Sequence, residues 1–174
     1  MVYNGNEVIL YINGMEKERV ATTLAGIDSD VMYVGKSNNG FGFNGKLDDV
    51  RIWDGAVTPN QIAVWAQAAF TGEACCPSAP DAWTDYSFDA CSGEDLFDEN
   101  MINDAEFFDA PNWTAGYLNQ GIDFDPIDGN SAITGVILPA ATMQDGFAVT
   151  AWINVNDNGT GKTIFAQVSN TPEA

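Results

Sequence analysis

The sequence predicts an all-β fold, an antiparallel sandwich with one short helix. Many short segments are rich in β-branched and aromatic residues, and turn residues such as Gly, Asn and Asp separate them. One segment alone combines an apolar face at helical spacing with good capping residues. Many short strands with turn signals between them are typical of antiparallel sandwiches.

The first predicted element is a hairpin. Residues 8–12 are apolar throughout, and an Asn-Gly pair follows at residues 13–14. Asn-Gly supplies the positive φ angles of a tight turn, so residues 8–12 and the polar run 15–23 are predicted to pair as antiparallel strands. Residues 31–34 are predicted to form another short strand, which Gly35 ends.

Residues 45–53 are predicted to form a longer strand with two different faces, because side chains alternate across a strand. The alternation places Asp48 on the same inward face as Val50 and Ile52. A lone carboxylate on a buried face is costly unless it is paired or binds a metal. The opposite face is expected to carry Asp49, Arg51 and Trp53.

Residues 59–69 are predicted to form the one helix. Thr58 is a good N-cap, Pro59 fits the first helical position, and Gln61 can complete a capping box. The apolar face, which is expected to pack on the sandwich, consists of Ile62, Trp65, Ala66 and Ala69.

Residues 71–80 read as a linker because Gly, Pro, Ser and paired Cys occur together there. Strands are predicted to resume at residues 83–88, 121–124, 132–138, 147–155 and 163–168. Within the strand 147–155, one face is expected to carry Phe147, Val149, Ala151 and Ile153, and the other Thr150 and Trp152.

Composition excludes several functions. The chain has 6 Lys and Arg residues against 25 Asp and Glu residues, a formal net charge of −19. Nucleic acids and anionic membranes are bound by basic surfaces, so neither is an expected partner. The chain has no His, which removes the commonest general base and every Ser-His or Cys-His nucleophile pair. No apolar run is long enough to span a bilayer, so membrane insertion is not expected.

The three cysteines, Cys75, Cys76 and Cys91, lack the spacing of a four-ligand zinc site. In an oxidising compartment Cys75 or Cys76 can pair with Cys91, which leaves one thiol over. Free, buried thiols are the alternative, and the sequence leaves both open.

Motifs in the first half resemble one known family. Residues 10–14 (LYING) are similar to a "LYVNG" hairpin, residues 43–53 (FNGKLDDVRIW) to an "FNGxIDDVRIY" strand, and residues 58–62 to an "LSxxEI" helix start. These motifs occur in the C-terminal part of laminin-G-like, concanavalin A-like lectin/glucanase sandwiches, which are found in bacterial surface and secreted proteins.

The second half resembles the N-terminal part of the same family. Residues 86–89 (YSFD) look like "YxFD", residues 98–100 (DEN) take the place of "DxSGN", residues 121–125 (GIDFD) look like "ALxFDG", and residues 147–153 (FAVTAWI) resemble "FTISAWV". The order is therefore permuted. The middle of such a domain is absent, including the "WHH" segment that usually precedes the hairpin.

The resemblance implies a jelly-roll sandwich and a division into three parts. Residues 1–70 correspond to the C-terminal half of one domain, residues 71–80 to a linker, and residues 81–174 to the N-terminal half of another. The chain is then either a fragment of tandem sandwiches, which we favour by origin, or a permuted, shortened sandwich. Each half alone would expose unpaired strand edges, so we expect the halves to pack together. They can do so within one chain or as a strand-exchanged homodimer.

The function implied by the resemblance is a non-catalytic carbohydrate- or matrix-binding module of an extracellular bacterial protein. A glycan or the extracellular matrix would be its partner, outside the cell or on its surface. The alternative is a structural spacer or adhesion domain without its own ligand site. A third reading, a glycoside hydrolase of the sandwich glucanase type, needs a Glu-x-Asp-x-x-Glu strand. The acidic residues 94–99 have the wrong spacing for it.

Two sets of site residues are predicted. The resemblance implies a structural calcium ion with Asp98, Asp89 and Asp48 as ligands, since calcium prefers oxygen. The alternative for Asp48 is a set of ordinary hydrogen bonds. Trp113, Tyr117 and Trp152 are candidates for a stacking platform that binds sugar, with packing in the core as the alternative.

Overall fold

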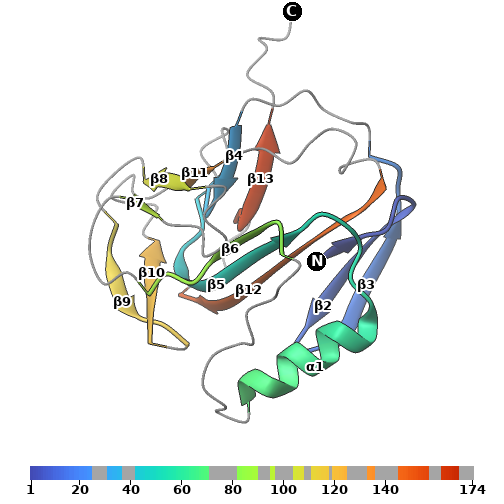
Figure 1. Ribbon diagram of the computed structural model, residues 1–174, viewed down its shortest axis with the longest axis horizontal. Helices are drawn as coiled ribbons and strands as arrows, with labels where there is room; N and C mark the ends of the chain where they lie inside the picture. Colours follow the sequence, from blue (N-terminus) through green and yellow to red (C-terminus); the bar gives the residue numbers. More distant parts are fainter. Residues whose placement is uncertain are drawn as a thin grey trace, which may run out of the picture.

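The computed structural model describes residues 1–24, 31–36, 42–70, 82–89, 95–96, 104–107, 111–117, 119–124, 133–135, 145–156 and 162–168. These residues form two antiparallel β-sheets and one helix (Figure 1). The predicted all-β sandwich with one short helix is thus confirmed.

Among the described residues, the larger sheet has eight strands. Its order is β3 (Met15–Ala21), β2 (Glu7–Ile12), β1 (Val2–Tyr3), β12 (Phe147–Val155), β5 (Gly45–Trp53), β10 (Gln120–Phe124) and β9 (Trp113–Ala115), and β6 (Thr84–Tyr86) also pairs with β5. The smaller sheet has the order β13 (Phe165–Val168), β4 (Val31–Val34), β11 (Ile133–Gly135), β8 (Ala105–Phe107) and β7 (Asp95–Leu96). Helix α1 spans Pro59–Phe70.

Strands from the two halves of the chain pair with one another in both sheets. β5 pairs with β12 along one edge and with β10 and β6 along the other. In the smaller sheet β4 lies between β11 and β13. The two halves therefore pair with each other within this chain, and a strand-exchanged homodimer stays a prediction. Their assignment to two domains of a longer protein stays a prediction.

One apolar core lies between the sheets, which we call the main core. Both halves contribute fully buried side chains to it. Burying each such side chain contributes about 1.5–3 kcal/mol relative to exposure, so each half depends on the other for much of its stability. The largest of these side chains are Tyr3, Met32, Leu47 and Ile52 from the first half and Tyr86, Phe88, Ile122 and Phe124 from the second.

Helix α1 begins with the predicted capping box. The backbone N–H of Thr58 donates to Oε1 of Gln61 at 2.9 Å, and the N–H of Gln61 donates to Oγ1 of Thr58 at 3.3 Å. These two bonds satisfy donors that a helix start otherwise leaves unpaired. No helix among the described residues is long and apolar enough to cross a membrane.

The apolar face of α1 packs on the outer face of the larger sheet, as predicted, beside β2 and β3 (Figure 1). The ring of Trp65 stacks on that of Trp53 from β5, with centroids 4.7 Å apart and planes 11° apart. Ile62 packs with Val2 and Ala148 in the same cluster. The helix therefore covers one end of the outer face.

β5 carries a bulge in its middle. Asp48 pairs with Trp152 of β12 while Arg51 pairs with Thr150, so two residues of β5 lie opposite one residue of β12. Asp49 lies in the bulge with a φ of 50°, a left-handed conformation that Asp tolerates better than most residues. A bulge of this kind reverses the alternation of faces along the strand.

The bulge makes one prediction wrong. Val50 and Ile52 lie in the main core together with Leu47, which would be impossible in a regular strand because residues 47 and 50 would then lie on opposite faces. Asp48 is thereby placed on the outer face, opposite Val50 and Ile52, although it is just 3% exposed. The strand β12 has no such reversal between Phe147 and Ala151. Its predicted inward residues Phe147, Val149 and Ala151 do contact the main core.

Candidate functional site

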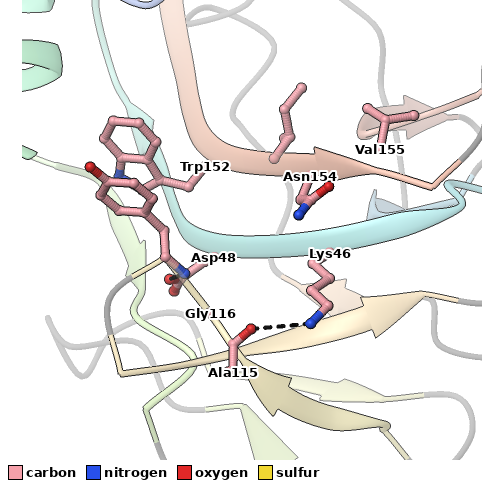
Figure 2. Close-up of a pocket in the computed structure, with 9 residues that line it drawn as sticks. Lys46, Asp48, Ala115, Gly116, Trp152, Asn154 and Val155 are labelled. Carbon is pink, nitrogen blue, oxygen red and sulfur yellow. Dashed lines mark hydrogen bonds between the residues drawn. The ribbon is translucent and has the colours of Figure 1, made fainter. Parts of the chain in front are cut away.

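An open depression of about 490 Å³ lies on the outer face of the larger sheet, where β5, β12 and the turn between β9 and β10 meet (Figure 2). Its polar and aromatic lining comes from both halves of the chain. Five side chains in the lining carry functional groups: Lys46, Asp48, Tyr117, Trp152 and Asn154.

The register between β5 and β12 brings four of these side chains together. Lys46 pairs with Asn154, and Asp48 pairs with Trp152. Directly opposed residues in antiparallel strands have Cβ atoms about 4.5–5.5 Å apart and project to the same face. Figure 2 shows Asn154 and Lys46 close together on the two neighbouring strands. The depression is therefore built on rigid paired strands on one side.

Tyr117 and Trp152 form an aromatic pair at the depression. Their ring centroids are 4.1 Å apart and their planes differ by 12°, which is a parallel stack. Trp152 comes from β12 and Tyr117 from the turn after β9, so the stack joins the turn to the sheet. Tyr117 nevertheless remains 43% exposed. An exposed ring held in a fixed orientation is suited to packing against an apolar face of a ligand.

Asp48 fixes the backbone of the same turn. Its Oδ2 atom accepts a hydrogen bond from the backbone N–H of Tyr117 at 2.7 Å. Gly116 makes room for the carboxylate, and Gly121 makes room for the neighbouring backbone of β5. A Cβ atom at Gly116 would overlap Oδ2 of Asp48, and one at Gly121 would lie 2.7 Å from the carbonyl oxygen of Leu47. Asp48 is thus buried beneath the turn that presents Tyr117.

On the opposite side of the depression, Lys46 links β5 to β9. Its Nζ atom donates to Oγ1 of Thr114 at 2.9 Å and to the carbonyl oxygen of Ala115 at 3.4 Å. Both acceptors are uncharged oxygens of β9, so these bonds hold the ammonium group without neutralising its charge. The Lys46 side chain is half-buried and reaches over β10 from β5. Lys46 therefore lines the depression in a fixed position, and Asp123 of β10 lies directly opposite it on the same face.

The bulge that places Asp48 is held by buried charges. Nη2 of Arg51 lies 3.3 Å from Oδ1 of Asp49, and Nε of Arg51 lies 2.9 Å from Oδ1 of Asp85 in β6. The three side chains are 13%, 10% and 7% exposed, in the order Arg51, Asp49, Asp85. The arginine thus binds the bulged residue of the first half to a strand of the second half.

Comparison with known families gives one match. Residues 1–63 match the model of a laminin-G-type family, described as the concanavalin A-like lectin/glucanases superfamily. The match covers 63 of the 174 residues, so this segment is similar to members of that superfamily. Comparisons with curated proteins and with solved structures gave no match. The laminin-G-like segment contains β1 to β5 and the start of α1, and the later strands complete its two sheets.

Two of the three predicted calcium ligands, Asp48 and Asp89, bind the same turn. Asp89 accepts the backbone N–H of Gln120 at 3.1 Å and the side-chain amide of Asn119 at 3.1 Å. Asp89 and Asp48 therefore bind the same turn between β9 and β10. Asp98 lies outside the described residues.

The described residues do not by themselves form a calcium site. Calcium takes six to eight oxygen ligands, and the described part of the chain gathers no group of three or more His, Cys, Asp or Glu side chains that would hold a metal. Both oxygens of Asp89 already accept hydrogen bonds within the turn. The calcium ion thus stays a prediction, and Cys75, Cys76 and Cys91 also lie outside the described residues.

The three aromatic residues predicted to form a platform do not all lie together. Tyr117 and Trp152 lie together on the outer face, whereas Trp113 pairs with Ile122, whose side chain is in the main core. Trp113 packs against that core and makes an edge contact with Phe107, with centroids 6.1 Å apart. Trp113 is therefore not part of the platform formed by Tyr117 and Trp152.

Sequence reasoning missed Lys46 and Asn154 as candidate site residues. Lys46 occupies the variable position of the motif at residues 43–53, Asn154 lies outside the quoted motifs, and the two are more than one hundred residues apart in the chain. Their only relation is the register of β5 and β12, which pairs them directly. A correct alignment of the two strands would have been the signal that identified them.

Proposed function

We propose that this protein is a non-catalytic carbohydrate- or matrix-binding module, and that it binds sugar in the depression on the outer face. The observation that carries the proposal is the stack of Tyr117 on Trp152, which holds a half-exposed aromatic ring beside polar side chains. Ligand sites typically combine aromatic or apolar surface with a few positioned polar groups. The match to a lectin and glucanase superfamily supports the same class.

Each lining residue has a distinct part in this proposal. The ring of Tyr117 packs against the apolar face of a sugar ring. The amide of Asn154 and the ammonium group of Lys46 are placed on paired strands, where they can donate hydrogen bonds to sugar hydroxyl groups. Asp48 acts as a positioning residue, because its bond to the N–H of Tyr117 fixes the turn that carries the ring.

The arrangement of carboxylates supports a binding role over hydrolysis. Glycosidases generally place two carboxyl groups about 5–9.5 Å apart across the scissile bond. Among the described residues that line the depression, Asp48 is the single carboxylate, and it is buried beneath the turn. Glu94 and Glu99 lie outside the described residues. Laminin-G-type domains are also generally non-catalytic.

We also propose that the protein acts outside the cell or on its surface. Laminin-G-like domains are typically extracellular. The net charge of −19 keeps such a surface soluble and free of nucleic acid and anionic lipid. The physiological ligand would then be a glycan or a component of the extracellular matrix.

A glycan array followed by calorimetric titration of the best ligand tests the binding role. Tyr117→Ala and Asn154→Ala are each expected to weaken binding at least tenfold, because each removes a contact in the depression. Val64→Ser is the matched control, since Val64 is 62% exposed on α1 and does not line the depression. Unchanged affinity in both depression variants would overturn the proposed site. An array without any hit would favour the spacer or adhesion role instead.

A further inference from the structure

β3 is an edge strand with an exposed surface. It lies at the end of the larger sheet, pairs with β2 on one side, and all seven of its residues are exposed. Among the described residues, no strand pairs with its other side. The outer edge of β3 therefore presents backbone N–H and C=O groups that can pair with a further strand.

The hairpin of β2 and β3 also carries uncovered apolar side chains. Val8 contacts the main core and pairs with Val20, so both lie on the core-facing side of the larger sheet. Alternation places Leu10 and Ile12 on the same side, and Met15 pairs with Ile12. We call these four exposed residues the hairpin strip: Leu10, Ile12, Met15 and Val20, which are 41%, 50%, 58% and 51% exposed.

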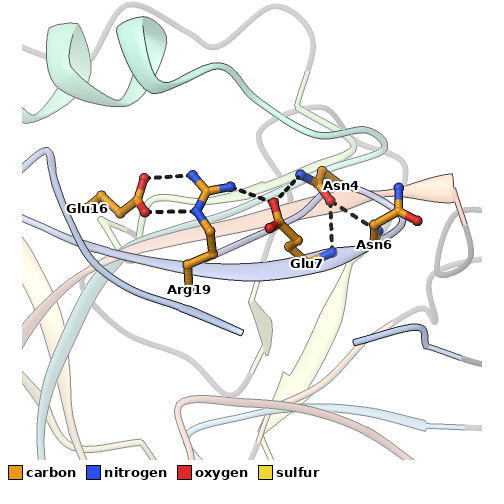
Figure 3. Close-up of polar contacts among 5 residues, drawn as sticks. All are labelled: Asn4, Asn6, Glu7, Glu16 and Arg19. Atoms are coloured by element: carbon orange, nitrogen blue, oxygen red, sulfur yellow. Dashed lines mark hydrogen bonds and ion pairs between the residues drawn. The ribbon is translucent and has the colours of Figure 1, made fainter. Parts of the chain in front are cut away.

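A bulge in β3 changes which face of the sheet its side chains occupy. Residues three apart in a regular strand lie on opposite faces. Nevertheless, Nη2 of Arg19 lies 2.8 Å from Oε2 of Glu16, so both side chains are on one face (Figure 3). The shift of register between Leu10 and Tyr11 in the β2–β3 pair accounts for this contact.

The charges on β3 are complementary to a second copy of the same strand. Residues 16–19 read Glu-Lys-Glu-Arg. An antiparallel copy, related by a two-fold axis between residues 17 and 18, places Arg19 of the second copy opposite Glu16. The same axis places Glu18 of the second copy opposite Lys17. Every charged residue then faces one of opposite sign, which stabilises cross-strand pairs.

This register also joins the apolar residues. Met15 falls opposite Val20 of the second copy, and both lie on the core-facing side because of the bulge. The hairpin strips of the two copies then lie on the same side of the joined sheet, with Glu18 of each copy at the axis between them. A two-fold contact of this kind uses one surface twice, as expected for a self-complementary dimer interface.

We propose that β3 is a self-association surface, through which two copies of this chain pair edge to edge and antiparallel. The contact is independent of the proposed sugar site. It also differs from an exchange of halves, because each chain keeps its own two halves paired.

The pattern of signs distinguishes this surface from a protected edge. Proteins often place charges on edge strands to prevent pairing, but a strand of one sign would serve that purpose by repelling its copy. On β3 the charges alternate in sign, so an antiparallel copy of the strand places opposite charges across from one another. The net charge of −19 opposes association at long range, but at 0.15 M salt the Debye length is about 8 Å. Contacts across the strand pair are then favoured over distant repulsion.

Sedimentation equilibrium of the whole chain at 0.15 M salt tests the proposal. Wild type is expected to dimerise reversibly. The double variants Glu16→Lys with Glu18→Lys and Lys17→Glu with Arg19→Glu make the four positions entirely positive and entirely negative, respectively. Each variant alone is expected to dimerise at least tenfold more weakly, and an equimolar mixture is expected to regain a dimer of wild-type strength.

A second measurement needs no substitution. Amide hydrogen exchange in β3 of the wild-type chain is expected to slow as protein concentration rises through the dimer dissociation constant, while exchange in α1 does not change. A wild-type chain that stays monomeric, or variants that dimerise as strongly as wild type, would overturn the proposal. Thermal unfolding of each variant confirms that a loss of dimer does not reflect a loss of fold.

Discussion

Arg51 and Asp85 join the two halves of the chain inside the molecule. Nε of Arg51 lies 2.9 Å from both carboxylate oxygens of Asp85, and the two side chains are 13% and 7% exposed. A charge removed from water in this way is stable only while its partner remains. The pair therefore links β6, at the start of the second half, to β5 of the first half.

Arg51→Met is expected to lower the free energy of unfolding by about 3–5 kcal/mol, because it leaves Asp49 and Asp85 buried without their cation. Urea denaturation followed by tryptophan fluorescence measures the change. Arg19→Met is the matched control, because Arg19 is 42% exposed in its ion pairs and such pairs contribute about 0–1 kcal/mol. Equal effects of the two substitutions would contradict the buried role of Arg51.

Asp48→Ala is expected to destabilise the chain by about 1–3 kcal/mol, since the N–H of Tyr117 then loses its acceptor in a part-buried position. Asp48→Asn keeps an acceptor oxygen and is expected to cost less. Thermal unfolding measures both, and titration with the sugar identified on the array measures their effect on affinity. If the two variants lost stability equally, the hydrogen bond would not be the main contribution of Asp48.

Stability is expected to rise with pH between about 6 and 8 in a polypeptide that begins at Met1. Burial lowers the pKa of the Met1 amino group from 8.0 to about 6. The unfolded chain therefore binds more protons than the folded chain in this window, and the folded state gains about 2 kcal/mol as pH rises through it. The chain has no His, so no imidazole titrates there.

Urea denaturation at half-unit steps of pH measures this dependence. A chain acetylated at its amino terminus is the control, because it has no amino group to titrate and should give a flat profile from pH 6 to 8. A slope of the same size in the acetylated chain would assign the effect to another group.

Separate expression of residues 1–70 and 81–174 is expected to give two polypeptides without cooperative unfolding transitions. The first polypeptide contains β5 without its partners β6, β10 and β12. The second contains these three strands without β5. Mixing the two during refolding is expected to restore one transition, measured by near-ultraviolet circular dichroism. A cooperative transition in either polypeptide alone would show that its half of the sandwich is self-sufficient.

The local elements were predictable because their signals lie within a few residues. Thr58 and Gln61 define the start of α1 through contacts three residues apart. The Asn-Gly pair at residues 13–14 sets the hairpin by its own backbone preference, and both residues have positive φ angles. By contrast, β1 and β7 have two residues each, which is too short for a periodic pattern to form.

The candidate site was predictable in its residue types but not in its assembly. Tyr117 and Trp152 were predicted as candidates because aromatic rings can stack on sugars. Trp113 has the same chemistry, but its pairing with Ile122 turns it toward the core. The face of a strand residue depends on its register, and a shift of one residue moves the side chain to the other side of the sheet.

The sequence by itself determined the class of fold, the capped helix and the alternation along β12, because hydrophobic periodicity and capping act over short stretches of chain. The tertiary structure alone decided that the two halves close on each other, that Asp48 lies on the outer face, and that Lys46 pairs with Asn154 in the register of β5 and β12. These features depend on contacts between residues far apart in the chain. The bulge at Asp49 is held by Arg51, which also binds Asp85 of the other half, and no local pattern contains that contact.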